Sequence, residues 1–303
     1  PVLIIEDGIH YGIAPKDYHA WEFNREDPGK GPISTSLFKS WLNDGPLKFR
    51  HAAKRESSAA MSWGSLVDCL LFTPHHFEGE FVLKEENPHL SADGGVRSAA
   101  AKAWMLEQAE LGKNVVSKDQ WETALTAVAG LKETPASGEI IEGGQYQVGM
   151  VYTPKDGIPT KGLIDVLPQH LDHDDCIADL KTTSVNLYRD GDLARQVAQY
   201  GYHIQAALYL FLWSKLTKDT RRRWKIIWQS SAPPYEVRVT ELEDTWLDAG
   251  RRVIMDCLPM MVRHFKKKHF PSPFSKVETV LPMHSASLYA LEDQVELITS
   301  LDS

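Results

Sequence analysis

Three charged residues in the second half of the chain have the types and spacing that phosphodiester chemistry uses. Asp165 and Asp179 each lie at or near the end of a segment expected to form a strand. Adjacent strands lie roughly 4.8 Å apart, so two such carboxylates can converge on one point, where they repel each other unless a proton or a divalent cation lies between them. Lys181 follows Asp179 by two positions, and residues i and i+2 of a strand point to the same face. These three side chains predict a Mg²⁺ or Mn²⁺ site at which the lysine orients water or balances charge.

The Asp-x-Lys pattern occurs once in the chain. Lys181 is the only lysine with an acidic residue two positions before it. A motif of three positions is weak when taken alone, and the structural alternative is a surface ion pair at a strand end. The surroundings favour the functional interpretation, because an apolar strand precedes Asp179, Asp165 lies in GLID upstream, and a long helix with a polar stripe follows.

The polar stripe consists of Tyr202, Gln205 and Tyr209, which share one face of an otherwise apolar helix. A buried glutamine needs hydrogen-bond partners, and a phosphate beside a metal would provide one. The structural alternative is a glutamine paired to the backbone, with both tyrosines in the core. Asp68, in the predicted helix segment GSLVD, would add a third carboxylate; the alternative there is an ordinary solvent-facing aspartate.

Helices are expected in the first part of the chain. Ser34 has the properties of an N-cap, Pro46 can open a second helix that runs to about Arg55, and Ser117 with Gln120 has the form of a capping box. Thr73-Pro74 is expected to end the helix predicted at 61–72. The helices predicted by apolar spacing and caps cover 33–44, 46–55, 61–72, 98–111 and 117–131.

The pattern changes to strands after a predicted loop at 135–144. Alternating and apolar runs predict strands, with a turn at 154–159, and two long segments with helical spacing predict helices. The strands are expected at 145–153, 160–168, 176–183, 224–231 and 234–242, and the helices at 195–216 and 243–267. This order predicts an α/β (mixed α+β) fold with a central mixed sheet flanked by helices. We interpret 1–303 as one domain: an N-terminal helical part (1–135), a catalytic core of sheet and helix (140–242), and a C-terminal helix and tail (243–303).

The composition is that of an ordinary soluble globular protein. Of 303 residues, 43% are hydrophobic and 24% charged, and no apolar run approaches the roughly 18–20 residues of a membrane helix. The start of the chain lacks the features of a signal peptide, so we expect a cytoplasmic protein without a membrane partner. Three cysteines far apart in sequence show no ligand spacing and are interpreted as buried thiols. The net charge of −8 disfavours a general nucleic-acid coat protein, but it is compatible with a nuclease whose carboxylates hold metal.

These motifs resemble the RecB-like branch of the PD-(D/E)xK nucleases, and among them the RecE (exonuclease VIII) type exonucleases of phages and prophages. The likeness covers roughly residues 30–270, and its specific part is the block 160–210, with GLID, CIADLKTT and YGYHIQAALY. The early ISTSLFKSWLNDGPLKFRH and the later PYEV are also similar to that family. The family's order of motifs corresponds here to Gly64 to Asp68, Asp165, Asp179 to Lys181, and Gln205 to Tyr209.

The resemblance implies a restriction-endonuclease-like core and a metal-dependent exonuclease that degrades double-stranded DNA from an end in the 5′-to-3′ direction, in phage-type recombination. It implies ring-shaped homo-oligomers, a RecT-like single-strand annealing partner, and work in the cytoplasm of a bacterial host cell. It assigns metal binding to Asp68, Asp165, Asp179 and the backbone carbonyl of Leu180. Lys181, Asp165, Asp179 and Gln205 would be catalytic, and Gln205, Tyr209 and Tyr202 would contact the substrate.

Two positions depart from the family pattern. Asp68 stands where the family usually has histidine; it is a harder ligand that still suits magnesium. Where RecE-like sequences often carry a glutamate near the start of the first strand, this chain has the neutral Gln145. These departures leave open an altered metal preference and a catalytically decayed DNA-binding module. An endonuclease of the same fold is also open, because active-site residues alone do not distinguish it from an exonuclease.

Weaker signals lie outside these motifs. Basic clusters at 221–225, 266–269 and 50–55 could hold phosphates, although solvated loops and helix ends are the simpler interpretation. His75-His76 and the group His170, His173 and Asp174 are interpreted as surface residues, because no metal-ligand spacing repeats.

Overall fold

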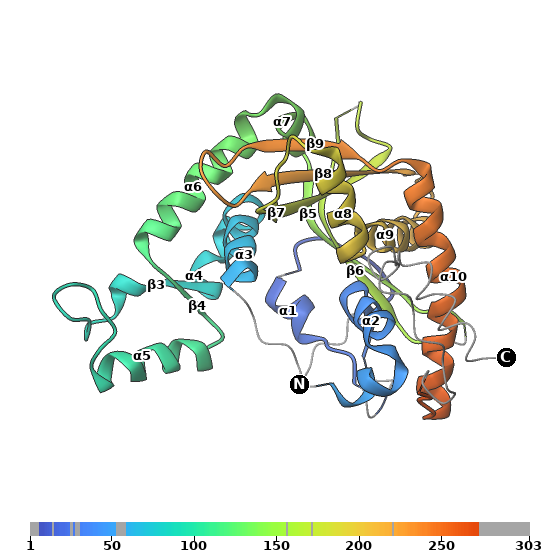
Figure 1. Ribbon diagram of the computed structural model, residues 1–303, viewed down its shortest axis with the longest axis horizontal. Helices are drawn as coiled ribbons and strands as arrows, with labels where there is room; N and C mark the ends of the chain where they lie inside the picture. The colour runs from blue at the N-terminus through green and yellow to red at the C-terminus, as the bar shows by residue number, and fades with distance from the viewer. Residues whose placement is uncertain are drawn as a thin grey trace, which may run out of the picture.

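A mixed seven-stranded sheet forms the centre of the protein (Figure 1). The computed structural model describes residues 6–13, 15–24, 27, 31–52, 59–155, 157–170, 172–219 and 221–272. The strand order is β1-β5-β6-β7-β8-β9, with β2 beside β6. The pairs β7–β8 and β2–β6 are parallel and the others antiparallel. The strands are β1 (Gly8–His10), β2 (Ile33–Ser34), β5 (Gln145–Tyr152), β6 (Thr160–Leu167), β7 (Cys176–Thr183), β8 (Arg223–Ser230) and β9 (Val237–Glu241).

Helices cover both faces of this sheet, and each helical layer has its own apolar core. On one face, α2, α9 and α10 pack with side chains such as Trp41, Ile226 and Trp228. On the other face, α3, α6 and α7 pack with Val166, Leu180 and other buried residues. The helices are α1 (Pro15–Ala20), α2 (Thr35–His51), α3 (Ala59–Phe72), α4 (Phe77–Glu80), α5 (Ala99–Glu110), α6 (Lys118–Glu133), α7 (Pro135–Ile141), α8 (Asp190–Tyr200), α9 (Tyr202–Leu216) and α10 (Asp244–Lys267), with 3₁₀ turns η1 (Pro74–His76) and η2 (Lys84–Glu86). The prediction of a mixed α/β fold is confirmed.

The predicted caps are confirmed. Ser34 Oγ accepts a hydrogen bond from the Leu37 amide at 3.2 Å, and Ser117 with Gln120 forms both bonds of a capping box before α6. The two helices predicted around Pro46 form the two halves of α2, which are separated at Gly45 (φ 72°, ψ 163°). The end predicted near residue 55 lies outside the described residues. Within the described part of the chain, no helix is long and apolar enough to span a bilayer.

Two predicted segments differ in the structure. The single helix expected at 195–216 is two helices, because Gly201 adopts a left-handed conformation (φ 60°, ψ 40°) between α8 and α9. Sequence periodicity continues across this glycine, which hides the break. The loop expected at 135–144 contains α7, which starts at Pro135 and buries Ile140 and Ile141 against the sheet. Proline at the first helical position is favourable, and its presence among small residues concealed a helix start.

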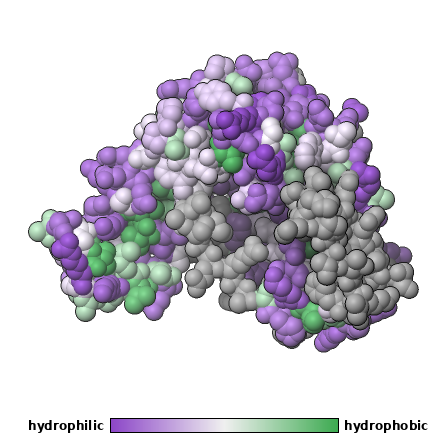
Figure 2. Space-filling view, viewed as in Figure 1, coloured by the Kyte–Doolittle hydropathy of each residue, from purple (hydrophilic) through white to green (hydrophobic). Residues whose placement is uncertain are grey.

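A small arm extends from the helical layer that contains α3 and α6 (Figure 1). It contains α4, α5 and a second sheet made of β3 (Phe81–Leu83) and β4 (Asn114–Val116), which pair in parallel. The face shown in Figure 2 is mainly hydrophilic, and hydrophobic residues gather on the arm. Leu106 and Leu111 are 66% and 59% exposed there.

The crossing of α9 and α10 depends on a glycine. A Cβ added at Gly250 would lie 2.4 Å from the His203 carbonyl oxygen. Backbone cannot yield to such a contact, so we expect Gly250→Ala to destabilise the fold by about 1–3 kcal/mol. Thermal unfolding measures this effect. Gly191→Ala is the matched control, because a Cβ there meets nothing within 4 Å; equal melting temperatures of the two variants would contradict the assignment.

Candidate active site

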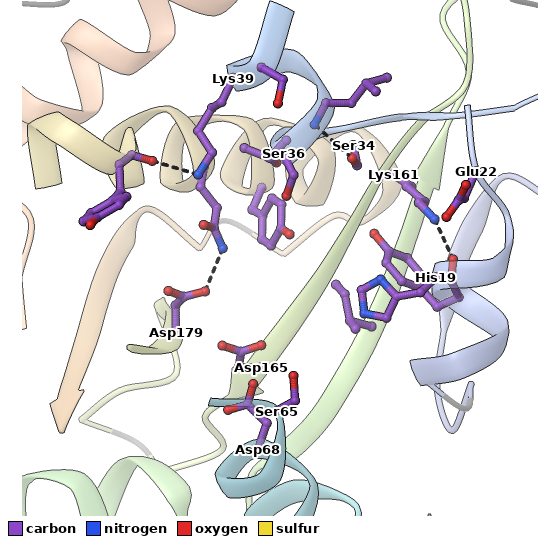
Figure 3. Close-up of a pocket in the computed structure, with 18 of the residues that line it drawn as sticks. His19, Glu22, Ser34, Ser36, Lys39, Ser65, Asp68, Lys161, Asp165 and Asp179 are labelled. Atoms are coloured by element: carbon purple, nitrogen blue, oxygen red, sulfur yellow. Dashed lines mark hydrogen bonds between the residues drawn. The ribbon is translucent and has the colours of Figure 1, made fainter. Parts of the chain in front are cut away.

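A cleft of about 1390 Å³ lies among α2, α3, α9 and strands β5 to β7, and it contains the predicted acidic residues (Figure 3). Asp165 comes from β6, Asp179 from β7 and Asp68 from α3. Their carboxylates point toward the same space in Figure 3. Two consecutive strands and a helix about 100 residues before them therefore bring three carboxylates into one cleft.

Asp179 is the most enclosed of the three carboxylates and has two side-chain partners. It is 2% exposed, and its Oδ1 accepts a hydrogen bond from Gln205 Nε2 at 2.7 Å. Its Oδ2 lies 2.5 Å from Lys181 Nζ. Leu180 between them is buried in the core of the opposite face, as expected for strand alternation. Asp179 lies within β7 rather than near its end, which differs from the prediction.

The side chain of Asp165 provides a hydrogen-bond acceptor where the backbone pairing of β6 with β7 ends. The paired register between β6 and β7 consists of Val166 with Ala178. Beyond that pair, Asp165 Oδ2 accepts the Leu180 amide hydrogen at 3.0 Å. A backbone amide that leaves a ladder in a buried place needs such an acceptor. The divergence of the two strands therefore opens the cleft and also holds one oxygen of Asp165 in place.

The electrostatics of the cleft show that the carboxylates oppose one another. Burial raises the pKa of Asp165 well above its usual range, and the charges of Asp179 and Asp68 raise it further. Burial raises the pKa of Asp68 to about 7; Lys181 opposes this shift and Asp179 adds to it. Burial alone would lower the pKa of Lys181, but the carboxylates of Asp179 and Asp165 raise it above the ordinary value. The neighbouring carboxylates therefore favour the charged form of Lys181.

The raised pKa of Asp68 predicts a pH-dependent stability. Its pKa is 3.8 in the absence of perturbation and about 7 here, so the folded form binds more protons between these values. Stability therefore falls as pH rises from about 4 to about 7, by at most ~1.4 kcal/mol per pH unit from this group. We expect Asp68→Asn to remove this slope in metal-free protein, so that denaturant unfolding curves of variant and wild type diverge between pH 4 and 7. Parallel pH profiles would contradict the shift.

The donor set in the cleft suits a hard divalent cation. Oxygen ligands are what Mg²⁺ and Mn²⁺ prefer, and a cation would relieve the repulsion that raises the pKa of Asp165 and Asp68. As the side chains stand, no three His, Cys, Asp or Glu residues of the described ranges are close enough to hold an ion together. Asp179 contacts Lys181 and Gln205 instead. Asp68, Asp165, Asp179 and the Leu180 carbonyl stay the predicted ligands of such a cation.

The two tyrosines of the predicted stripe differ in their surroundings. Tyr209 is 8% exposed, packs edge-on against Trp224 at 5.7 Å, and has its pKa raised to about 12 by burial. It touches the cleft from the core side, where a Cβ at Gly162 would come within 2.9 Å of its ring. Tyr202 is half-buried and lies 5.2 Å from Lys181 Nζ, measured to the ring centroid. The stripe therefore lines the cleft, and its role in substrate binding stays a prediction.

Several cleft residues were missed from the sequence. The exposed Gln145 does not face the carboxylates, whereas Gln147 lines the cleft, 7% exposed and with a positive φ of 48°. The neutral residue of the first long strand beside the site is thus Gln147.

Two lysines near the site were also missed from the sequence. Lys39 of α2 lines the cleft, with its pKa lowered to about 8 by burial and by Lys181. Lys161 is buried and donates to the Tyr18 and Trp21 carbonyls at 2.5 and 2.7 Å. For Lys161, the only signal in the sequence was strand alternation, because it places Lys161 and Asp165 on the same face of β6.

Three basic side chains of the run at 221–225 make contacts within the fold. Arg221 is buried and donates to the Pro168 and Cys176 carbonyls. Arg223 pairs with Asp175 and Glu241, and Lys225 Nζ lies 2.7 Å from His173 Nδ1. These contacts join the start of β7 to β8 and β9. For Arg221, Arg223 and Lys225 they correct the picture of a solvated loop.

This fold and site define a nuclease fold of the PD-(D/E)xK class. The chain belongs to the family described as PDDEXK-like domain of unknown function (DUF3799), whose model matches residues 34–280. The resemblance to the PD-(D/E)xK class predicted from the sequence is confirmed.

Several solved structures are similar to the chain, and two of them are described as exonucleases. A protein of Eubacterium rectale described as a candidate exonuclease has 17% identity and a TM-score of 0.53, over 92% of this chain and 99% of that one. A phage-related exonuclease of Haemophilus somnus 129PT has 12% identity and a TM-score of 0.32, over 67% of this chain and 95% of that one. The first of these likenesses shows the fold. Among curated proteins, none matches the chain.

Proposed function

We propose that this protein is a metal-dependent exonuclease that hydrolyses phosphodiester bonds of double-stranded DNA from an end. The observation that carries the proposal is the arrangement of Asp179, Lys181 and Gln205, with Asp165 and Asp68 facing the same cleft. A bound divalent metal would polarise the phosphate and lower the pKa of water. Hard carboxylate donors beside a lysine ammonium are the groups that this chemistry needs.

Each residue of the cluster has a role in this proposal that follows from its contacts. Lys181 is cationic and lies beside the carboxylates, so it can hold an attacking water or balance the charge that develops on the phosphate. Gln205 fixes Asp179 through one oxygen and leaves the orientation of the other to Lys181. Asp165 is held by the Leu180 amide, which places the Leu180 carbonyl in the neighbourhood of the cluster.

The finer parts of the proposal rest on the resemblance of the sequence motifs to the RecE type exonucleases; the family match and the exonuclease description of the Eubacterium rectale protein support only its coarser part, a nuclease. The finer parts are 5′-to-3′ digestion, magnesium or manganese as the ion, and phage-type recombination in the cytoplasm of a bacterial host. They also include a ring of several copies and a RecT-like partner. An endonuclease of the same fold uses the same cluster, so it remains the second candidate.

Digestion of linear and closed circular duplex DNA tests the proposal. Wild type and Lys181→Ala are compared with Mg²⁺ and with Mn²⁺. Loss of linear DNA alone, abolished by the substitution, is the expected result. Cutting of the circle would favour an endonuclease, and the absence of any lysine-dependent cutting of either substrate would overturn the catalytic proposal and leave a DNA-binding module.

A further inference from the structure

Three aromatic rings form a column that leads from the core to the mouth of the cleft. Trp228 of β8 is fully buried, and its Nε1 donates to Thr240 Oγ1 at 2.8 Å. Tyr202 packs against Trp228 with ring centroids 5.9 Å apart. Tyr200 stacks on Tyr202 at 5.7 Å with an interplanar angle of 23° and is 47% exposed. The inner rings hold the outer ring in a fixed orientation.

The backbone between the two tyrosines is also fixed. Gly201, in its left-handed conformation, separates the helices that carry Tyr200 and Tyr202. Lys39 Nζ donates to the Tyr200 carbonyl at 2.8 Å; Figure 3 shows this bond as the dashed line from Lys39. The interruption of the long predicted helix therefore has a consequence for the site: it places two tyrosine rings in a near-parallel stack that one continuous helix would not give.

This aromatic column stands beside the cationic groups of the cleft. Lys181 Nζ and Lys39 Nζ lie 5.2 and 5.6 Å from the centroid of the Tyr202 ring. Tyr200, Tyr202 and both lysines line the cleft. A nucleotide carries an aromatic base and an anionic phosphate a few ångströms apart. The cleft thus offers an aromatic face next to two ammonium groups that suit the phosphate.

We propose that Tyr200, supported by Tyr202, is a stacking platform for a nucleobase of the bound DNA strand close to the bond that is cut. Stacking requires no hydrogen-bond readout, so the platform accepts any base and selects for a base that has left the duplex stack. An exonuclease works at ends, where bases separate most easily, and a platform of this kind would hold the unpaired terminal region. The inference rests on the proposed nuclease function and adds a substrate-binding residue to it.

The first test compares DNA affinity among four variants, with Ca²⁺ in place of Mg²⁺ so that binding is observed without turnover. Loss of a stacked base weakens binding by about 5- to 100-fold. We expect this loss for Tyr200→Ala, and near wild-type affinity for Tyr200→Phe and Tyr200→Trp, which keep a ring. The control is Tyr188→Ala, since Tyr188 is 76% exposed, does not line the cleft, and donates its hydroxyl to Glu236. Unchanged affinity of Tyr200→Ala would overturn the platform.

The second test locates the base. Duplexes with 5-iodouracil at one of the last four positions of either strand are irradiated with the protein, and the crosslinked residue is identified by mass spectrometry. Crosslinking to Tyr200 from one or two adjacent positions is expected, and its loss in Tyr200→Ala. Crosslinks that never reach Tyr200, in a protein whose cutting depends on Lys181, would overturn the platform and leave the nuclease proposal intact. A protein that neither cuts nor binds DNA would overturn both.

Discussion

Replacement of Lys181 by alanine is expected to lower the rate of DNA cleavage by about 10²- to 10³-fold, the cost of removing one charge-stabilising donor from an active site. The lysine lies directly against Asp179, with Nζ 2.5 Å from Oδ2. The surrounding carboxylates raise its pKa, so its charge is present throughout the working pH range. Without that charge, the negative charge that develops on the phosphate in the transition state is not balanced. We expect the backbone of β7 to keep its conformation.

The measurement is single-turnover cleavage of a labelled linear duplex in Mg²⁺, with circular dichroism to establish that the variant is folded. Lys225→Met is the control, because Lys225 lies on the neighbouring strand, is buried, and contacts His173 outside the cleft. We expect Lys225→Met to affect stability and to leave the cleavage rate of folded protein near wild type. Cleavage by Lys181→Ala at the wild-type rate would remove the lysine from the chemistry.

The parts of the fold that could be predicted from the sequence are those that local rules determine. Alternation in strands gave Asp179 and Lys181 a common face, and the structure confirms it, because Leu180 between them packs in the opposite core. Caps at Ser34 and Ser117 depend on neighbours three residues away, so they too were visible. Apolar periodicity located both helical layers, and their combination with the strands predicted the mixed sheet.

The rest depends on contacts between distant segments. Gly201 breaks the long helix by its left-handed conformation, which the apolar pattern on either side does not reveal. Lys39 reaches the site because α2 packs beside α9, and Gln147 does so through a positive φ within β5. Neither position has a motif of its own. The aromatic platform was equally hidden, since Tyr200 and Tyr202 are near in sequence and stack only because the helix is interrupted between them.

A second large effect is expected at Asp165, and it separates metal binding from folding. Asp165→Asn keeps the size of the side chain and an oxygen that can accept the Leu180 amide hydrogen, a bond of 3.0 Å in the wild type. It removes one of the three carboxyl groups whose ionised forms oppose each other in the cleft. We therefore expect the metal-free variant to be at least as stable as the wild type, and its cleavage in Mg²⁺ to fall by 10²-fold or more, on the order of what one removed transition-state contact costs.

Thermal unfolding with and without divalent metal measures both consequences. A ligand at about 100 times its Kd stabilises a folded protein by about 2.7 kcal/mol, so Mn²⁺ or Mg²⁺ should raise the melting temperature of the wild type and of the control Asp248→Asn. The carboxylate of Asp248 is 62% exposed on α10 and pairs with Arg251, away from the cleft. Asp165→Asn should lose the metal-induced rise. A rise equal to that of the wild type would show that the metal binds elsewhere, and a large loss of metal-free stability would show that Asp165 serves the sheet more than the ion. The first of these outcomes would exclude the proposed ligand set. The repulsion among the carboxylates, which no cation would then relieve, would be a cost of folding without a purpose in catalysis.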